Sequence, residues 1–414
     1  MNNFLKIQIE KISYFLLLSL IILFPLNQQF HIRPFPNIEG VIIDYLILKV
    51  SLPEILLIIF TFFNISNIVN LFKFVINLNF KDILLISFLI ILVILNIFRS
   101  NYLYLAAYEN LIILLIVLNA LTLKNYNKVD LNFLLGMSLK FWMCSLIILG
   151  SFQVYFQESV LDNYYYFGEF TYSSNNYHIK QDGFILDKLI PAYGIFSHSN
   201  IYGGFFLISL MLLHLIKKQN AFFVFLGILG VFLSGSMNIL IGLVMFLIFF
   251  YLKINFKFLF IYPLFLILVL NYLSLSFANY SSDLSIYRRL YMVNLSNNKF
   301  LENPTEFVFG FGYFNYFREV SENLYTYEII RFFQPPHNVF YFYIWNYGFL
   351  FLISFIVFAY RLLKDSNSNF QLVIIILISV SMLDHFLFTN HQLKMLLFLI
   401  LPYSIKRVVS IKMN

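Results

Sequence analysis

Charged residues are scarce in this sequence of 414 residues. Asp, Glu, Lys and Arg make up 11% of the chain, whereas hydrophobic residues make up 61%. A soluble domain carries about 25% charged residues, so we do not expect the chain to be water-soluble throughout. Cysteine is nearly absent, which excludes a disulfide framework. The single Cys144 lies in an apolar run, and we interpret it as a small core residue.

Several signals of soluble enzyme sites are also missing. There is no Cys/His spacing typical of a bound metal, and no glycine-rich phosphate loop followed by Lys and Ser or Thr. No soluble nucleotide-binding domain exists to hold a nucleotide sugar, so a transferase here must use a donor already in the membrane. The net charge of +7 sits in short loops rather than on one face. We therefore expect no metal, no cofactor and no nucleic-acid partner.

Long hydrophobic runs fill most of the chain. A membrane helix needs about 20 apolar residues, and windows of this size predict an all-α integral membrane protein with about 12 transmembrane helices in one domain, 1–414. The first run lacks a small-residue cleavage site, so we interpret it as an uncleaved span. The predicted spans are 12–28, 42–66, 82–98, 101–123, 131–153, 190–216, 220–235, 237–252, 257–276, 338–362, 370–388 and 391–406.

The distribution of Lys and Arg indicates an orientation. If the N-terminus is cytoplasmic, every inside turn holds at least two cations, as the positive-inside rule demands, and most acidic residues fall outside. This predicts both termini in the cytoplasm and two long outside loops, 154–189 and 277–337. Long ordered loops in compact proteins are usually functional. The tyrosines and amides of the first loop suit sugars, although such tyrosines also form the interfacial aromatic belt.

His337 is the first candidate for chemistry. It stands at the mouth of a long apolar run, directly after Pro335 and Pro336, which stiffen its approach. A neutral imidazole can accept a proton from a sugar hydroxyl near neutral pH. Asn338 suits the N-cap of the helix that follows. The alternative interpretation is that the whole segment is a helix-entry device.

Arg288 and Arg289 form the second candidate. The guanidinium fork matches phosphate oxygens, so paired arginines beside a membrane could hold a lipid-linked diphosphate; the alternative is headgroup snorkelling. A third stretch, 191–200, joins the first loop to the sixth span. There we expect His198 to line the same outward cavity as His337, whereas helix packing alone could explain the nearby glycines. Asp384, His385, Asn390 and His391 we interpret as a polar turn.

Together these stretches resemble the O-antigen polymerase and O-antigen ligase superfamily of bacterial inner membranes. The resemblance covers about 190–351, and the N-terminal half is similar in hydropathy only. The matching elements, in family order, are Gly194-Ile195-Phe196-Ser197-His198-Ser199-Asn200, the hairpin Leu233-Ser234-Gly235-Ser236-Met237, Arg289, Gly310-Phe311-Gly312, and His337-Asn338 with Gly348.

Two positions depart from the family pattern. The hairpin arginine of the family is Met237 here, and Arg288, Arg331 or Lys188 are candidates to substitute for it. The family also often carries an arginine just before the Gly-x-Phe stretch, in the region that Pro191-Ala192-Tyr193 occupies here.

The resemblance implies metal-independent glycosyl transfer at the periplasmic face of the inner membrane, in a GT-C-like fold. The donor would be an oligosaccharide on undecaprenyl diphosphate, and the partners would be the lipid bilayer and, in addition, a chain-length regulator. His337 would act as base or orient the acceptor, and Arg289 would stabilise the departing diphosphate. The residues expected to bind substrate are Arg288, His198, Asn200, Asn338, Arg331 and Tyr193.

Several functions stay open at this point. A polysaccharide polymerase is favoured over a ligase that transfers glycan to lipid A core, on base rates alone. A lipid-linked glycan flippase would show internal repeats and charges within its spans. No repeat is visible, and the intramembrane charges are few: Lys49, Glu54, Glu109 and Lys140. A purely structural membrane subunit would leave the long polar loops unexplained.

Overall fold

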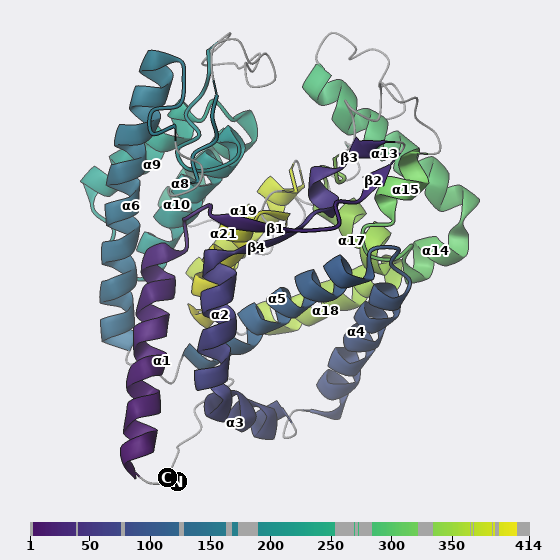
Figure 1. The fold of residues 1–414 in the computed structure, drawn as a ribbon, viewed down its shortest axis with the longest axis horizontal. Coiled ribbons are helices and arrows are strands. Elements are labelled where there is room, and N and C mark those ends of the chain that lie inside the picture. The colour runs from purple at the N-terminus through teal and green to yellow at the C-terminus, as the bar shows by residue number, and fades with distance from the viewer. Residues whose placement is uncertain are drawn as a thin grey trace.

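The protein is mostly helical (Figure 1). A computed structural model describes residues 3–38, 40–75, 79–123, 128–162, 168–172, 189–252, 269, 272, 284–321, 334–364, 366, 368–382, 384–385 and 389–403. The helices are α1 (Asn3–Leu23), α2 (Leu52–Phe63), α3 (Ile65–Val75), α4 (Phe80–Phe98), α5 (Leu103–Thr122), α6 (Lys128–Phe156), α8 (Ser199–Leu215), α9 (Ala221–Leu233), α10 (Met237–Leu252), α13 (Leu284–Glu302), α14 (Pro304–Phe309), α15 (Tyr316–Ser321), α17 (Val339–Tyr347), α18 (Phe349–Lys364), α19 (Ser368–Ser381) and α21 (His391–Ile400).

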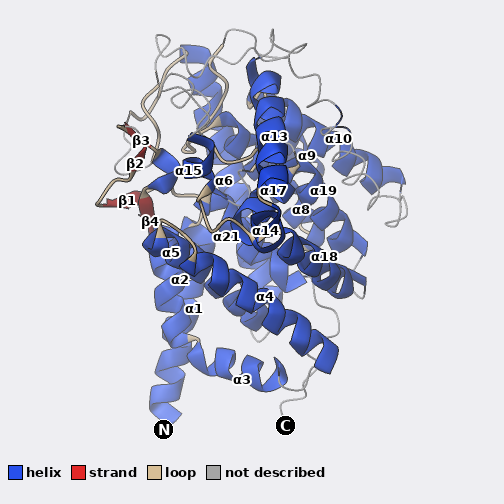
Figure 2. Ribbon diagram, turned by 90° about the vertical axis from the view of Figure 1, so that its right-hand side faces the viewer, coloured by secondary structure: helices blue, strands red, loops and turns tan. Residues whose placement is uncertain are grey.

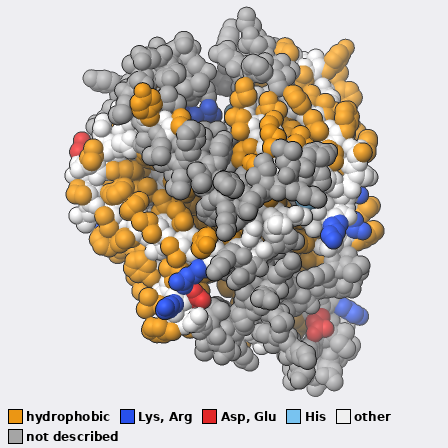
Figure 3. Space-filling view, turned by 180° about the vertical axis from the view of Figure 1, so that it is seen from behind, with side chains coloured by type: hydrophobic (Ala, Val, Ile, Leu, Met, Phe, Trp, Pro, Cys, Tyr) orange, Lys and Arg blue, Asp and Glu red, His pale blue; other side chains and the backbone are white. Residues whose placement is uncertain are grey.

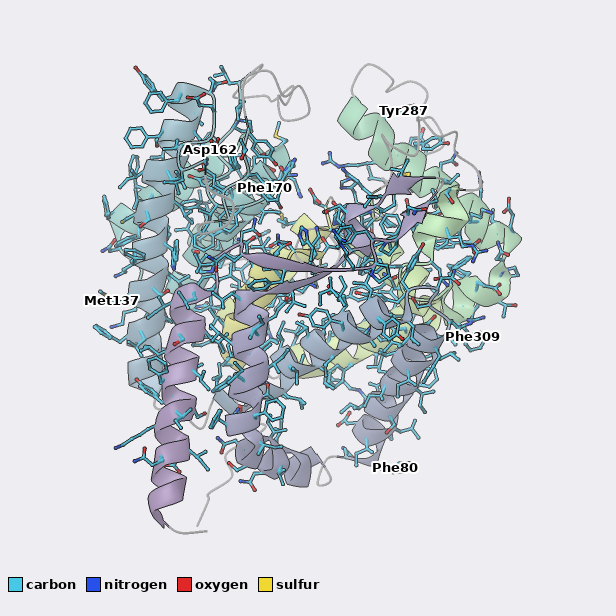
Figure 4. The ribbon with its side chains drawn as sticks, viewed as in Figure 1. Phe80, Met137, Asp162, Phe170, Tyr287 and Phe309 are labelled. Atoms are coloured by element: carbon cyan, nitrogen blue, oxygen red, sulfur yellow. The ribbon has the colours of Figure 1, made fainter. Side chains whose placement is uncertain are left out.

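Apolar helices with apolar outer surfaces indicate a membrane-embedded protein, as predicted. Within the described part of the chain, α4, α5 and Leu131–Phe156 of α6 are long and apolar enough to cross a membrane, and the bent pair α2–α3 would make a fourth span. Large side chains such as Phe80 and Met137 face outward (Figure 4), and hydrophobic side chains cover both flanks in Figure 3. Exposed apolar surface on this scale suits lipid rather than water.

The stretch 42–66 is not a single span. Strand β1 (Gln29–Ile32) pairs antiparallel with β4 (Leu48–Ser51), and β2 (Asn37–Ile38) pairs with β3 (Val41–Ile42), so the fold is not purely α-helical. Helix α2 begins only after β4, where Ser51 and Glu54 form a capping box. The apolar residues before Ser51 are divided among β3, a short 3₁₀ helix (Asp44–Leu46) and β4.

A second departure lies at Asn64, where α2 and α3 meet at a bend of 72°. The buried Asn64 amide donates to Asn119 Oδ1 at 3.0 Å and to Thr122 Oγ1 at 2.6 Å, both on α5. These hydrogen bonds attach the bend to α5, while the backbone N–H of Asn64 still donates to Phe60 O at 2.9 Å. As a result α3 lies across the direction of α1, near the end where α1 begins (Figure 2).

The core consists of two hydrophobic clusters. The first draws its buried side chains mainly from α1, α6, α8, α9 and α10, on the left of Figure 1, together with α19 and α21. The second draws on α4, α13, α17 and α18, on the right. The C-terminal helices α19 and α21 lie between these two groups. Segments from both groups therefore meet near the middle of the molecule.

The predicted outside loop 277–337 contains helices rather than loop alone. Residues 284–321 form α13, α14 and α15, and Met292, Val293 and Phe300 of α13 are buried in the second cluster. Of the loop 154–189, α6 continues to Phe156, while 163–167 and 173–188 lie outside the described residues. The predicted span 257–276 also lies outside them, apart from Val269 and Tyr272, and the predicted span 190–216 becomes helical only at Ser199.

The four charged residues that the sequence places within predicted spans have different surroundings in the structure. Lys49 lies on β4 and pairs with Asp44 at 2.5 Å, so it is not within a helix. Glu54 is buried, whereas Glu109 is partly buried and forms an ion pair with the buried Lys394 of α21. Lys140 lies 5.0 Å from the ring of Phe223.

Gly348 interrupts the predicted span 338–362. It ends α17 with φ of +89°, a conformation that glycine adopts without strain. A Cβ there would lie 2.4 Å from the Val308 carbonyl oxygen and 2.5 Å from the Gly310 nitrogen. Backbone atoms cannot move aside as a flexible side chain can, so only glycine lets α17, α18 and the end of α14 pack this closely.

Gly348→Ala is therefore expected to lower stability by more than about 1 kcal/mol, since strain at such backbone angles costs about 1–3 kcal/mol. Thermal unfolding of the detergent-solubilised protein measures the loss. Gly136→Ala is the matched control: its new Cβ would meet only flexible side chains at 3.3 Å or more, inside a helix. Equal unfolding temperatures for the two variants would contradict the close packing at Gly348.

Candidate functional site

Polar residues from four separate segments meet between the two hydrophobic clusters. His337 and Asn338 precede α17, His198 and Asn200 stand at the start of α8, and Arg289 lies on α13. The fourth segment connects α19 to α21 and carries Asp384 and His385. We call these seven residues the central polar cluster. Its members come from both sides of Figure 1, so the packing of helices, rather than chain proximity, brings them together.

Asp384 is the centre of this cluster. Its Oδ2 accepts a hydrogen bond from Asn200 Nδ2 at 2.8 Å, and its Oδ1 accepts from the His385 backbone N–H at 2.8 Å. The same Oδ1 lies 3.5 Å from His337 Nδ1, an ion-pair contact rather than a well-formed hydrogen bond. One buried carboxylate thus joins the beginning of α8, the approach to α17 and the connection after α19.

The charge state of this connection follows from its surroundings. Burial opposes ionisation of Asp384, but the contact with His337 and the charges of His337, His385 and Arg289 outweigh it, so the Asp384 pKa lies below its usual range. Burial lowers the pKa of His385 to about 3, and the charge of His337 acts in the same direction. Near neutral pH, Asp384 is therefore ionised and His385 is neutral.

Local capping fixes two of the predicted residues. Asn338 is the N-cap of α17: its Oδ1 accepts from the N–H of Phe340 at 2.9 Å and of Tyr341 at 3.4 Å. His198 is the N-cap of α8, with Nδ1 accepting from Asn200 N at 3.1 Å. Because Nδ1 is an acceptor, the neutral ring carries its proton on Nε2 and presents a donor.

His198 lies within electrostatic range of the rest of the cluster. Its side chain keeps exposed surface, yet the protein atoms packed around it lower its pKa, as do the charges of His337 and Arg289, against the opposite effect of Asp384. The His198 ring is thus surrounded by protein and still reachable by a ligand, as a ring at the wall of a concave site would be.

A small, partly open pocket borders the cluster; its empty space of about 340 Å³ includes solvent beyond the mouth. Its lining is mostly apolar, with a few hydrogen-bond donors at the wall. Among the described residues, Arg289 Nε and Asn338 Nδ2 have no hydrogen-bond partner, and both are donors. The residues that line the pocket are Arg289, Met292, Val293, Ser296, Pro336, His337, Asn338, Tyr341 and Met382.

The structure brings together five of the eight residues predicted from sequence: His337, Arg289, His198, Asn200 and Asn338. Tyr193 is placed elsewhere. It is buried against Tyr172, with ring centroids 4.7 Å apart, and its backbone N–H donates to Gln153. Tyr193 therefore packs apart from the central polar cluster, and its role in substrate binding stays a prediction. The side chain of Arg288 and the whole of Arg331 lie outside the described residues.

Sequence reasoning missed Asp384, His385 and Gln334 as parts of the site. Asp384 and His385 were interpreted as a polar turn, although an adjacent Asp-His pair immediately after an apolar run was a usable signal. Gln334 Oε1 lies 2.9 Å from His337 Nε2. One ligand atom each from His337, Asp384 and His385 lie within 4.8 Å of one another, so these three could hold a metal ion.

Met237, the first residue of α10 and the position where the resemblance leads us to expect an arginine, is exposed. Comparison with models of protein families, with curated proteins and with solved structures gave no match to this chain.

The hydrogen bond between Asn200 and Asp384 predicts an energetic coupling. Asn200→Ala removes a donor to a charged group and should cost about 1.5–3 kcal/mol of stability. The same change in an Asp384→Asn background should cost much less, because the charge is already gone. Reversible unfolding of the four proteins in a double-mutant cycle measures the coupling. Additive effects would mean that these two side chains do not interact.

Proposed function

We propose that this chain is a membrane glycosyltransferase that moves a glycan from a polyprenyl diphosphate, such as undecaprenyl diphosphate, to the hydroxyl of a lipid-linked repeat unit. The observation that carries the proposal is the pocket beside His337 and Arg289. Its unpartnered donors could bind an anionic, oxygen-rich group, whereas Met292, Val293 and Met382 could pack against a hydrocarbon chain. A lipid diphosphate joins both in one molecule.

The geometry supports a role for each polar residue. Arg289 faces the pocket and is half-buried, where its charge is screened less than in water. In the transfer, the acceptor oxygen forms a bond to the anomeric carbon, the bond from that carbon to the phosphate oxygen breaks, and the diphosphate leaves with the electron pair. Arg289 would stabilise that developing charge, and the acceptor proton would pass to His337.

Asp384 acts as a positioning residue for His337. In the tautomer protonated on Nδ1, the imidazole directs that N–H toward Asp384 Oδ1, and Nε2 is left as the base. The oxygen of Gln334, 2.9 Å from Nε2, occupies a place that an acceptor hydroxyl could take. The stabilisation of imidazolium by a buried carboxylate follows the logic of known acid–base dyads.

His337→Ala is expected to lower transfer about 100- to 10,000-fold, the range typical of a positioned acid–base group. Arg289→Ala should lower it about 100- to 1,000-fold, because one donor to the developing charge is lost. The measurement uses purified full-length protein with a synthetic polyprenyl-diphosphate-linked repeat unit. His214→Ala is the matched control, since His214 pairs with Gln219 at the other end of α8. Near-wild-type rates for both site variants would remove the catalytic assignment.

The same geometry serves a ligase, whose acceptor is lipid A core. Cells lacking the native gene separate the two functions. Loss of long chains, with a single repeat still attached to core, is expected for the polymerase. Absence of repeats on core, with lipid-linked polymer accumulating, would instead identify the ligase.

One observation favours a flippase: the buried ion pair of Glu109 with Lys394, close to Glu54. Intramembrane ion pairs often mark a transport path. Here, however, Glu54 caps α2 and accepts from Tyr108 at 3.0 Å, so the group is anchored by fixed hydrogen bonds between helices. A flippase would keep its activity in His337→Ala, which distinguishes it from the transferase.

A further inference from the structure

We propose that His337, Asp384 and His385 form an inhibitory binding site for a divalent transition metal such as Zn²⁺. One ligand atom from each residue lies within 4.8 Å of the others. A carboxylate with two imidazoles is a donor set that suits Zn²⁺ and its neighbours, whereas Mg²⁺ and Ca²⁺ prefer oxygen ligands. The site overlaps the transfer centre, but the metal is not needed for the reaction proposed above.

The hydrogen bonds of His385 leave one nitrogen free to bind a cation. The Thr389 hydroxyl donates to the His385 carbonyl oxygen at 3.2 Å, so its oxygen is left to accept from His385 Nδ1 at 2.8 Å. The ring proton therefore sits on Nδ1, and Nε2 carries a lone pair. His385 is 4% exposed, and its Nε2 has no partner among the described residues.

The surroundings of His385 resemble those of metal-ligating histidines, whose second nitrogen usually donates to an oxygen nearby. Thr389 supplies that oxygen. The ring of Tyr45 packs edge-on against the imidazole, with centroids 5.6 Å apart, and limits its rotation. The orientation of the His385 ring is thus restricted before any metal binds.

His337 presents a second lone pair in one of its tautomers. The Gln334 oxygen only accepts hydrogen bonds, so at 2.9 Å it accepts one from the N–H at His337 Nε2. In the neutral ring Nδ1 then carries a lone pair, and that lone pair faces Asp384 Oδ1 at 3.5 Å. Two electron-rich atoms this close repel each other unless a cation lies between them, either a proton or a metal ion.

The distances fit a tetrahedral ion. Zinc lies about 2.0–2.2 Å from nitrogen and oxygen ligands, which places two ligands about 3.4 Å apart. His337 Nδ1 and Asp384 Oδ1 are already at 3.5 Å. The rings of His337 and His385 are 5.0 Å apart at their centroids and the three ligand atoms lie within 4.8 Å of one another, so His385 must move closer to complete three ligands. Asn200 occupies the other Asp384 oxygen and fixes the carboxylate.

Metal binding and proton transfer require opposite states of His337. As a base, the ring needs its proton on Nδ1 toward Asp384 and a free Nε2; as a ligand through Nδ1, it holds the proton on Nε2 against Gln334. A bound metal therefore removes the base from the reaction. This inhibitory consequence rests on the proposed function, whereas metal binding itself does not. Arg289 opposes the metal by charge, and its presence limits the affinity.

The test is a titration of the purified full-length protein in detergent with Co²⁺, followed by its visible absorption bands and by competition with Zn²⁺. We expect His385→Ala to weaken binding more than about 100-fold. Thr389→Val removes only an outer hydrogen bond and should weaken it about 10- to 100-fold. Arg289→Gln should tighten binding, although it impairs transfer. His214→Ala should leave binding unchanged.

Two outcomes would overturn the metal site: Co²⁺ bands that persist in His385→Ala, or no saturable binding to the wild-type protein. Inhibition is tested separately, with the synthetic lipid-linked substrate. We expect Zn²⁺ to inhibit the wild type and chelation to restore activity. Half-maximal inhibition of His385→Ala, judged against that variant's own metal-free rate, should need more than about 100-fold more Zn²⁺. Inhibition that survives His385→Ala would contradict the shared use of His337. If the transferase assignment is wrong, no turnover of the lipid-linked substrate is observed, but the Co²⁺ titration still tests the metal site.

Discussion

The arrangement of the site depends on one buried carboxylate. An ionised carboxyl group in a largely apolar protein is costly unless each oxygen has partners. Asp384 finds them in Asn200 on α8, in its neighbour's backbone N–H and in His337 before α17. Those partners belong to elements on both sides of the molecule, so satisfying the charge also fixes how α8, α17 and the connection after α19 meet. The contacts of Asp384 therefore both arrange the candidate site and determine how these segments pack.

The helical, membrane-embedded character could be predicted from the sequence because lipid demands long apolar runs, and such runs are visible in any window. The interruptions could not. Gly348 sits between residues as apolar as those of a continuous span, and the obstacle to a side chain there is the backbone of α14. The strands before Ser51 could not be predicted either, because a short apolar run is compatible with both a strand and a helix.

The candidate site was predicted in part for a similar reason. His337, His198 and Arg289 each stand out as polar residues at the edge of an apolar run, so sequence alone selects them. Asp384 has the same appearance, but its importance comes from what it touches, 184 positions from Asn200. Such a contact depends on helix packing and leaves no local trace. Tyr193 lies in the motif region as well, but its ring packs against Tyr172, a contact that the sequence does not indicate.

The pocket limits the class of ligand by what its wall leaves unpaired. A free sugar carries hydroxyls around its whole ring, so the side facing Met292, Val293 and Met382 would lose its hydrogen bonds to water and gain none. A purely apolar ligand would leave Arg289 Nε and Asn338 Nδ2 buried without acceptors. A ligand with an anionic head and a hydrocarbon tail avoids both costs.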